Sequence, residues 1–206
     1  MKKFNNAGFS IIEILVGIFI FTLGLLSVYL MLHSSVRMND YSRHEIIAAN
    51  LARESLDLVK NIRDTNFSEQ TAWNLINPNN YLGDKFELET YYKIENNFDD
   101  SVFAVKTSKI DYFAEGKNEV NSKMKDYRLY LDDKDRYIYE NNSINNKPTE
   151  FYKYIKIEKA DYTDENGDLV EIDENEALRV ISKVIWTTNG YHEVELRTII
   201  TNWKKL

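Results

Sequence analysis

The stretch AGFSIIEILVGIFIF, residues 7–21, begins an apolar run long enough to cross a membrane, yet it contains a glutamate at position 13. Almost every residue of 9–32 is apolar, and residues 14–36 include no Asp, Glu, Lys or Arg. As an α-helix, residues 9–32 would rise about 36 Å, which is enough to span the hydrocarbon core of a bilayer. The sequence therefore predicts one membrane-spanning helix close to the N-terminus.

The charges that flank this run predict its orientation. Lys2 and Lys3 precede it, and the positive-inside rule keeps such an end in the cytoplasm. Everything after Arg37 would then lie on the other side of the membrane. The run also carries small or weakly polar residues of the kind found where helices pack in lipid, namely Gly17, Thr22, Gly24 and Ser27.

Three interpretations of the apolar run compete. A secretory signal has a shorter apolar core and a small-residue cleavage site, and LMLHSSVRM, residues 30–38, provides only a poor one. A plain signal anchor explains the length and the lysines but leaves Glu13 unexplained. A carboxylate within the membrane costs about 2.5–3.5 kcal/mol and usually marks a function, although one near the interface reaches water at little cost.

The third interpretation comes from the residues around Glu13. MKKFNNAG followed by FSIIEILVGIFIF resembles the type IV prepilin signature: a short basic leader ending in Gly, then an apolar residue, usually Phe, and Glu at the fifth mature position. Gly8, Phe9 and Glu13 match these three positions. The resemblance implies that a prepilin peptidase cleaves after Gly8 on the cytoplasmic side and that Phe9 is then N-methylated.

Physical chemistry gives this pattern a purpose. Cleavage creates an α-amino group with a pKa of about 7.7–8, so it is largely protonated. When such helices bundle with an axial offset, Glu13 of one subunit can meet the Phe9 ammonium of its neighbour. The low dielectric makes an unpaired Glu13 costly and a paired one selective. Our hypothesis is that Glu13 sets the register of assembly.

The helical pattern continues beyond the membrane. Residues 9–64 contain no proline, and a continuous helix of that span would be about 84 Å long. Arg53–Asp57 and Lys60–Asp64 have the spacing of ion pairs on its polar side. We expect the opposite side to pack on a globular domain through an apolar stripe at Ile47, Ala48, Leu51, Ala52, Ser55, Leu58, Val59 and Ile62.

A second, looser resemblance lies in this helix. ANLARESLDLVKNIRDTNF, residues 49–67, is similar to the equivalent stretch of minor pilins and pseudopilins. It favours a minor component over a main filament subunit.

Strands and turns are predicted after about residue 68. Asn166-Gly167 is a strong tight-turn signal, and DDKD at 132–135 marks another turn. Around these turns we expect strands within 85–95, 126–140, 151–162, 169–172, 177–187 and 191–203.

The last two strands form the clearest hairpin. In the second of them, Val194, Leu196, Thr198 and Ile200 alternate with Glu193, Glu195 and Arg197, so one face is buried and one is wet. Arg179 and Lys183 on the first strand would face Glu193 and Glu195. The predicted fold class is α+β, with a long N-terminal α-helix packed against a C-terminal antiparallel sheet, as in type IV pilins.

Composition excludes several function classes. The 206 residues have a net charge of −7 and no cysteine, which excludes thiolate chemistry and disfavours nucleic acid as a partner. His33, His44 and His192 lack metal-ligand spacing, and no catalytic motif or cofactor-binding motif occurs. The acidic clusters at 132–135 and 161–168 are interpreted as solvated turns and not as calcium sites. The many distal tyrosines are interpreted as half-buried packing.

We therefore predict four segments: a leader (1–8), a transmembrane and assembly helix (9–36), its amphipathic continuation (37–67) and a β-rich globular domain (68–206). The predicted protein is a minor pilin or pseudopilin and not an enzyme. Its partners would be other pilin subunits, the prepilin peptidase, an assembly platform with its ATPase, and membrane lipid. It would reside in the cytoplasmic membrane and then in a filament at the cell surface. The alternative is an extracytoplasmic binding domain tethered by an uncleaved anchor.

Overall fold

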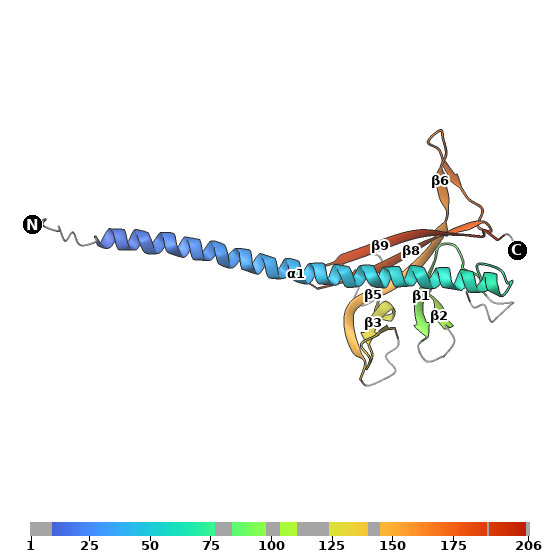
Figure 1. Cartoon of the computed structure of the whole chain (residues 1–206), viewed down its shortest axis with the longest axis horizontal. Helices are drawn as coiled ribbons and strands as arrows, with labels where there is room; N and C mark the ends of the chain where they lie inside the picture. The colour runs from blue at the N-terminus through green and yellow to red at the C-terminus, as the bar shows by residue number, and fades with distance from the viewer. Residues whose placement is uncertain are drawn as a thin grey trace, which may run out of the picture. The chain divides into compact units, whose positions relative to one another are not determined.

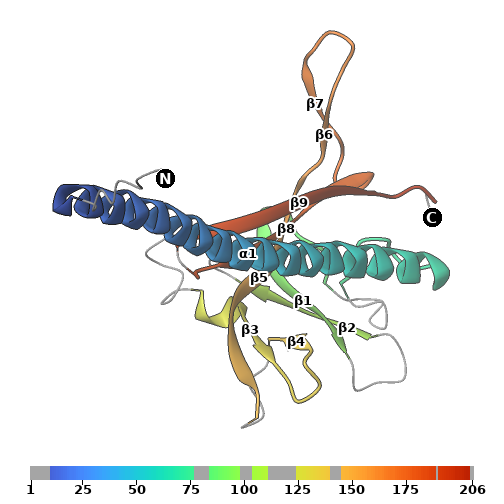
Figure 2. The same ribbon diagram turned by 60° about the vertical axis from the view of Figure 1, so that its left-hand side comes forward.

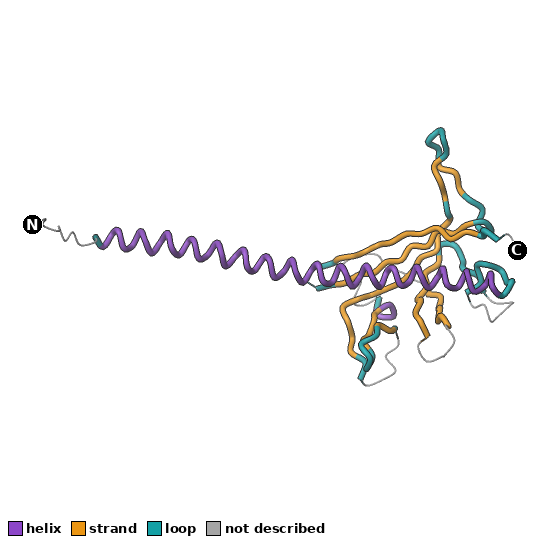
Figure 3. Tube along the Cα trace, viewed as in Figure 1, coloured by secondary structure: helices purple, strands orange, loops and turns teal. Residues whose placement is uncertain are grey.

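The computed structural model describes residues 10–76, 84–97, 104–110, 124–139, 145–188 and 190–204. One long helix, α1 (Ile11–Ser68), precedes every described strand, and Figure 3 shows this separation of helix and strands along the chain. The chain divides into two compact units, residues 1–44 and 45–206, and α1, labelled in Figure 1, contributes residues to both. The predicted α+β class is confirmed, with α1 ending at Ser68.

The main sheet is antiparallel and is built around one long strand, β5 (Lys147–Lys159). On one edge, β5 pairs with β8, and β8 pairs with β9. The other edge is divided: β1 pairs with residues 155–157 of β5, whereas β3 pairs with residues 147, 148 and 152. Figure 2 shows the two arms separating from β5, one made by β1 and β2 and the other by β3 and β4. The remaining strands of this sheet are β1 (Thr90–Asn97), β2 (Ala104–Ile110), β3 (Arg128–Leu131), β4 (Tyr137–Ile138), β8 (Ala177–Trp186) and β9 (His192–Thr201).

The distal half of α1 packs on this sheet through the predicted stripe. Ile47 and Leu58 are only partly buried and lie at the margin of the stripe. Alternate residues of β5 and β8 meet the helix, among them Ile155, Ile157 and Val180. The residues of α1 that are buried are Ala48, Leu51, Ala52, Ser55, Leu56, Val59, Ile62, Asn66 and Phe67.

The other face of β5 is also covered. Tyr152 and Tyr154 are buried there with Met124 and with Tyr127, which belongs to the short 3₁₀ turn η1 (Lys125–Tyr127). The rings of Tyr127 and Tyr154 meet edge to face, with centroids 5.5 Å apart. Among the residues that the structure describes, five tyrosines of the distal domain are buried and thus serve as packing, as the sequence indicated: Tyr92, Tyr127, Tyr139, Tyr152 and Tyr154.

A second, two-stranded sheet is formed by β6 (Asp161–Thr163) and β7 (Leu169–Glu171), which project from the main sheet in Figures 1 and 2. Gly167 has a φ of 89° at its turn, a left-handed conformation that glycine adopts without strain. The predicted turn and return strand are therefore confirmed. Residues 161–176 hold eight of the 33 acidic residues and no Lys or Arg, so the net negative charge of the chain is concentrated here.

The predicted cross-strand ion pairs are half right. Lys183 Nζ lies 3.3 Å from a Glu193 carboxylate oxygen and 3.5 Å from one of Glu195, as expected for the β8–β9 hairpin. Arg179 was predicted to join them, but Ile199 is its partner in register. Its guanidinium instead makes a two-point contact with the Asp161 carboxylate, with Nη1 donating to Oδ2 at 3.0 Å.

The ion pairs predicted along α1 also differ from those observed. Lys60 pairs with Asp57 at 3.4 Å, three residues away, and Arg63 Nη2 lies 2.8 Å from Asp64 Oδ1. The predicted pairs Arg53–Asp57 and Lys60–Asp64 are not formed. Both observed pairs lie on the exposed side, where such contacts are weak and exchange readily.

Asn66 fixes the turn that follows α1. Its side chain is buried, and Nδ2 donates to the carbonyl oxygens of Trp73 at 3.1 Å and Leu75 at 2.9 Å. The Asn66 carbonyl in turn accepts from the Thr71 backbone N–H at 3.0 Å. The asparagine of the RDTNF stretch is thus a structural residue that holds the returning chain.

We expect Asn66→Ala to lower the free energy of unfolding by about 1–3 kcal/mol, because two buried carbonyls lose their donor. The measurement is urea denaturation of the full chain in detergent micelles. Asn61→Ala, on the exposed side of α1, is the matched control and should change the stability by less than about 0.5 kcal/mol. Equal effects of the two substitutions would contradict a structural role for Asn66.

Candidate functional site

The candidate site is the first half of α1, which begins at Ile11. The backbone N–H groups of Glu13 and Ile14 donate to the Ser10 carbonyl at 3.0 and 3.2 Å, so Ser10 starts the helix. Ser10 and Glu13 have the residue types and spacing of a capping box, a signal that the sequence reasoning missed. Glu13 lies in the first turn, where the helix dipole favours a negative charge.

Large apolar side chains cover this part of α1 on all sides. Ile11 is 79% exposed, and within the described residues no side chain buries any of the large apolar residues up to Met38. The helix is long and apolar enough to cross a membrane. A continuous exposed apolar surface of this extent requires lipid or other apolar helices around it. The apolar half of α1 therefore has the length and composition of a membrane anchor.

The hydroxyl groups within this helix are satisfied locally. Thr22 Oγ1 donates to the Ile18 carbonyl at 2.7 Å, and Ser27 Oγ donates to the Leu23 carbonyl at 2.9 Å. These two residues therefore cost little in lipid. Glu13 is different: it is the one charged residue of 11–36, and no described residue donates a hydrogen bond to its carboxylate.

The two glycines of the anchor are not required by the fold of this chain. A Cβ atom placed on Gly17 or Gly24 would meet no other atom within 4 Å. At about 100° per residue, both glycines lie on the same side of α1 as Glu13. This side combines the only carboxylate of the anchor with a surface that another helix can approach closely.

The other predicted site residues lie outside the described residues: Lys2, Lys3, Gly8 and Phe9. Glu13 is therefore the one member of the predicted set with a described position.

The acidic clusters are turns closed by their own carboxylates. Asp132 Oδ1 accepts from the backbone N–H groups of Lys134 and Arg136, at 2.9 and 2.8 Å. Asp164 Oδ1 accepts from those of Asn166 and Asp168, both at 2.9 Å. The Asp168 backbone donor is the main reason that the pKa of Asp164 is lowered. Among the residues that the structure describes, no group of three or more His, Asp or Glu could hold a metal ion.

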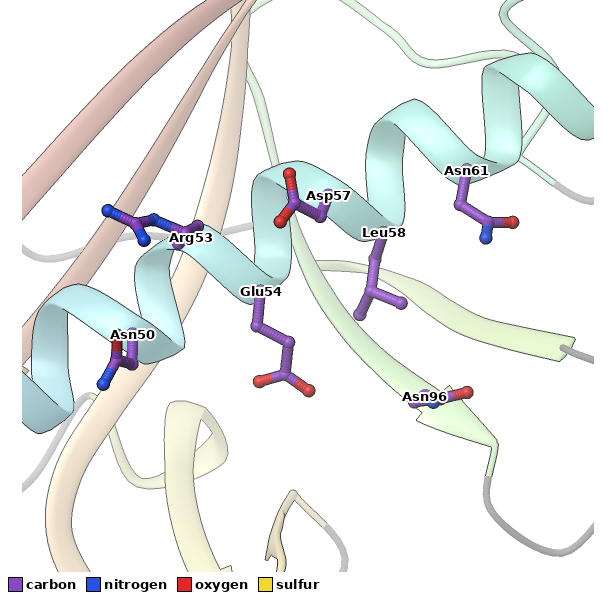
Figure 4. A pocket seen from close by; sticks show the side chains of 7 residues that line it. All are labelled: Asn50, Arg53, Glu54, Asp57, Leu58, Asn61 and Asn96. Carbon is purple, nitrogen blue, oxygen red and sulfur yellow. The ribbon is translucent and has the colours of Figure 1, made fainter.

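The globular unit also contains an open groove of about 410 Å³ beside α1. Six residues of the helix between Asn50 and Asn61 line it, together with Asn96 of β1 (Figure 4). The side chains are mostly polar, with three asparagines, and Leu58 is the one apolar member.

Comparison with known families places the anchor in context. Residues 3–29 match the prokaryotic N-terminal methylation motif, a span that includes Gly8, Phe9 and Glu13. No curated protein and no solved structure matches the chain. This match supports a type IV prepilin-like protein, and the long apolar helix followed by a distal antiparallel sheet agrees with it. Proteins with this motif are structural and not enzymatic.

Proposed function

We propose that this protein is a structural subunit, a minor pilin or pseudopilin, of a type IV pilus, a type II secretion pseudopilus or a related filament. One observation carries the proposal: the methylation motif leads directly into an exposed apolar helix whose single carboxylate is at position 13. The apolar surface of the anchor must be shielded from water at every stage. Lipid shields it before assembly, and neighbouring anchor helices shield it in a filament.

Processing follows from the same segment. Lys2 and Lys3 keep the leader, residues 1–8, in the cytoplasm, where the prepilin peptidase cleaves after Gly8. Phe9 then becomes the methylated N-terminus of the assembly helix, residues 9–36. The amphipathic continuation, residues 37–67, and the globular domain, residues 68–206, lie outside the cytoplasmic membrane and later at the cell surface.

Assembly combines a non-directional force with a directional one. Burial of the anchor side chains among neighbouring helices supplies most of the free energy, because apolar contact stabilises roughly in proportion to area. The Phe9 ammonium of one subunit and the Glu13 carboxylate of the next select the axial offset. Gly17 and Gly24, on the same side as Glu13, let the two helices approach.

The partners are those that such a cycle needs: other pilin subunits, the prepilin peptidase with its methyltransferase activity, the assembly platform and its ATPase, and membrane lipid. Nucleic acid is not among them, since the projecting hairpin holds eight acidic residues and no basic one in residues 161–176. The similarity of residues 49–67 to minor pilins and pseudopilins favours a minor subunit.

A substitution at the cleavage site tests this function. Gly8→Val puts a branched side chain where the signature has glycine, so the chain in its own host should keep its eight leader residues and be lost from the filament fraction. Intact mass and immunoblots of membrane and filament fractions measure both effects. Asn6→Ala, inside the leader, is the matched control and should be processed normally. Normal processing of Gly8→Val would refute the proposed cleavage site.

The alternative, a binding domain on an uncleaved anchor, makes a different prediction. The native chain would then retain Met1 and stay in the membrane fraction, and Gly8→Val would have no effect on either property.

A further inference from the structure

The face of α1 that packs on the sheet has a repetitive pattern. Small, aliphatic or weakly polar residues recur after alternating steps of four and three residues, at Ala48, Ala52, Ser55, Val59, Ile62 and Asn66. Between Ala48 and Ile62, a helix displaced by one turn, about 5.4 Å, would again place small, weakly polar or aliphatic residues on the sheet. Apolar contact alone is non-directional and therefore specifies the axial position of such a helix weakly.

One flank of the helix gives little additional restraint. The open groove follows α1 from Asn50 to Asn61, and Leu58 is the one apolar residue that reaches into it (Figure 4). The axial position must therefore be specified elsewhere.

A buried charge lies beside this groove, where the sheet divides. Lys153 falls between the part of β5 that pairs with β1 and the part that pairs with β3, and it is only 1% exposed. Its Nζ lies 3.3 Å from Glu54 Oε2 of α1. Glu54 is also a wall of the groove, so this ion pair links the helix directly to the central strand.

Beyond α1, the site around the ammonium is built from β1 and from Tyr139, the residue after β4. The Lys153 Nζ lies 5.5 Å from the centroid of the Tyr139 ring. The Tyr139 hydroxyl donates to the Lys153 carbonyl at 2.9 Å, and the Tyr139 backbone N–H donates to Glu95 Oε2 at 3.0 Å. Lys93 of β1 lies over the same ring at 5.8 Å. The surroundings of Lys153 are thus fixed from α1, β1 and the residue after β4.

Lys153 is the buried member of this ion pair, whereas the Glu54 side chain is 37% exposed at the groove. Burying a charged group in this way is a poor way to gain stability, because desolvation usually equals or exceeds the attraction of the pair, and well-packed apolar replacements are often neutral or stabilising. Burial lowers the pKa of Lys153, and the Glu54 carboxylate offsets only part of this. The best-attested benefit of such a pair is that it specifies one register among several similar ones.

We propose that the Lys153–Glu54 pair sets the axial register of the distal half of α1 against the sheet. The idea that a fixed register helps filament assembly rests on the proposed function. The register itself can be measured in the isolated full chain. A failure of the register proposal can therefore be distinguished from a failure of the proposed function.

Spin-label distances in the full chain test the register. The chain has no cysteine, so Asp64→Cys on α1 and Arg197→Cys on β9 give two unique, exposed labelling sites. In detergent micelles the parent chain should give one narrow distance. Lys153→Met removes the buried charge and leaves Glu54, whose side chain is 37% exposed and stays in contact with water, so the urea midpoint should change little. The distance distribution should broaden or gain a component shifted by up to about 5 Å.

The controls isolate the buried pair. Lys60→Met removes an exposed lysine of α1, which pairs with Asp57 at 3.4 Å. It should leave the distance between the two spin labels unchanged. Glu54→Gln keeps the shape of the side chain and should broaden the spin-label distance distribution in the same way. If Lys153→Met fails to fold, Glu54→Gln gives the decisive result. A native, narrow distribution in the folded pair variants would overturn the proposal.

The pH dependence of stability provides a second readout. Because the pKa of Lys153 is lowered in the folded state, the unfolded chain binds more protons, and stability should rise with pH from the lowered pKa towards about 10. The charged groups facing Lys153 are Glu54, Glu95 and Lys93, and Tyr139 stays neutral because burial raises its pKa. Lys153→Met should lose this rise, and a persisting rise would show that Lys153 is not its source.

Discussion

Glu13→Val is expected to be cleaved and inserted like the native chain but to fall roughly 100-fold in the filament fraction. Removing one partner of a buried ion pair costs about 3–5 kcal/mol, because the other charge stays buried and unpaired, and each 1.4 kcal/mol is a factor of ten in an equilibrium. The Phe9 ammonium would be that unpaired charge. Insertion into lipid should improve, since the substitution removes a carboxylate from the apolar run.

The measurement is an immunoblot of sheared filaments and membranes from the native host. Glu13→Gln, which keeps the shape and loses the charge, should behave like Glu13→Val. Ile12→Val, one residue away, is the matched apolar control and should assemble normally. Native levels of Glu13→Val in the filament would show that the carboxylate does not select the register.

Trp186→Ala is expected to have the largest effect on stability, lowering the free energy of unfolding by about 3–5 kcal/mol. Trp186 is 1% exposed at the end of β8, and its ring packs against Phe151 and His192, with centroids 6.4 and 5.3 Å away. It belongs to the cluster that receives Ala48, Leu51 and Ala52 of α1. Its loss leaves a cavity under the point where the helix enters the domain.

Urea denaturation of the full chain in detergent micelles measures this effect. Trp203→Ala is the control, because Trp203 is 61% exposed beside Phe67, and it should cost less than about 1 kcal/mol. A Trp186→Ala chain as stable as the Trp203→Ala chain would contradict the packing described for β8.

The overall fold was predictable because its strongest signals are local. The unbroken helical period of residues 47–62 and the alternation of residues 193–200 each follow from one buried face. The turn at Asn166-Gly167 follows from the conformational freedom of glycine. The division of the β5 edge between β1 and β3 was not predicted, because strand order depends on contacts between residues distant in sequence.

Lys153 shows where the alternation of polar and apolar residues along a strand fails to predict burial. In FYKYIKIEKADY, residues 151–162, a lysine between two tyrosines suggests a wet face and a packed face. The structure buries both faces of β5, one under α1 and the other under Met124 and Tyr127, so Lys153 is buried with the rest. The partner of Arg179 was predicted wrongly for a different reason: Asp161 lies in the projecting hairpin, whose position beside β8 is not a local signal.

The candidate site divides in the same way. Glu13 could be singled out from sequence because a carboxylate in an apolar run is costly wherever it lies. The hydrogen bonds that start the helix at Ser10 and the open space around Gly17 and Gly24 needed the structure. Cleavage and methylation at Gly8 and Phe9 are chemical events of the host and stay predictions.

The most direct test is the mass of the N-terminal peptide of the mature protein purified from its own host. The prediction is a chain that begins at Phe9 and carries one N-methyl group there. A chain that still begins at Met1, or one cut near Ser35, would contradict the assignment as a processed filament subunit.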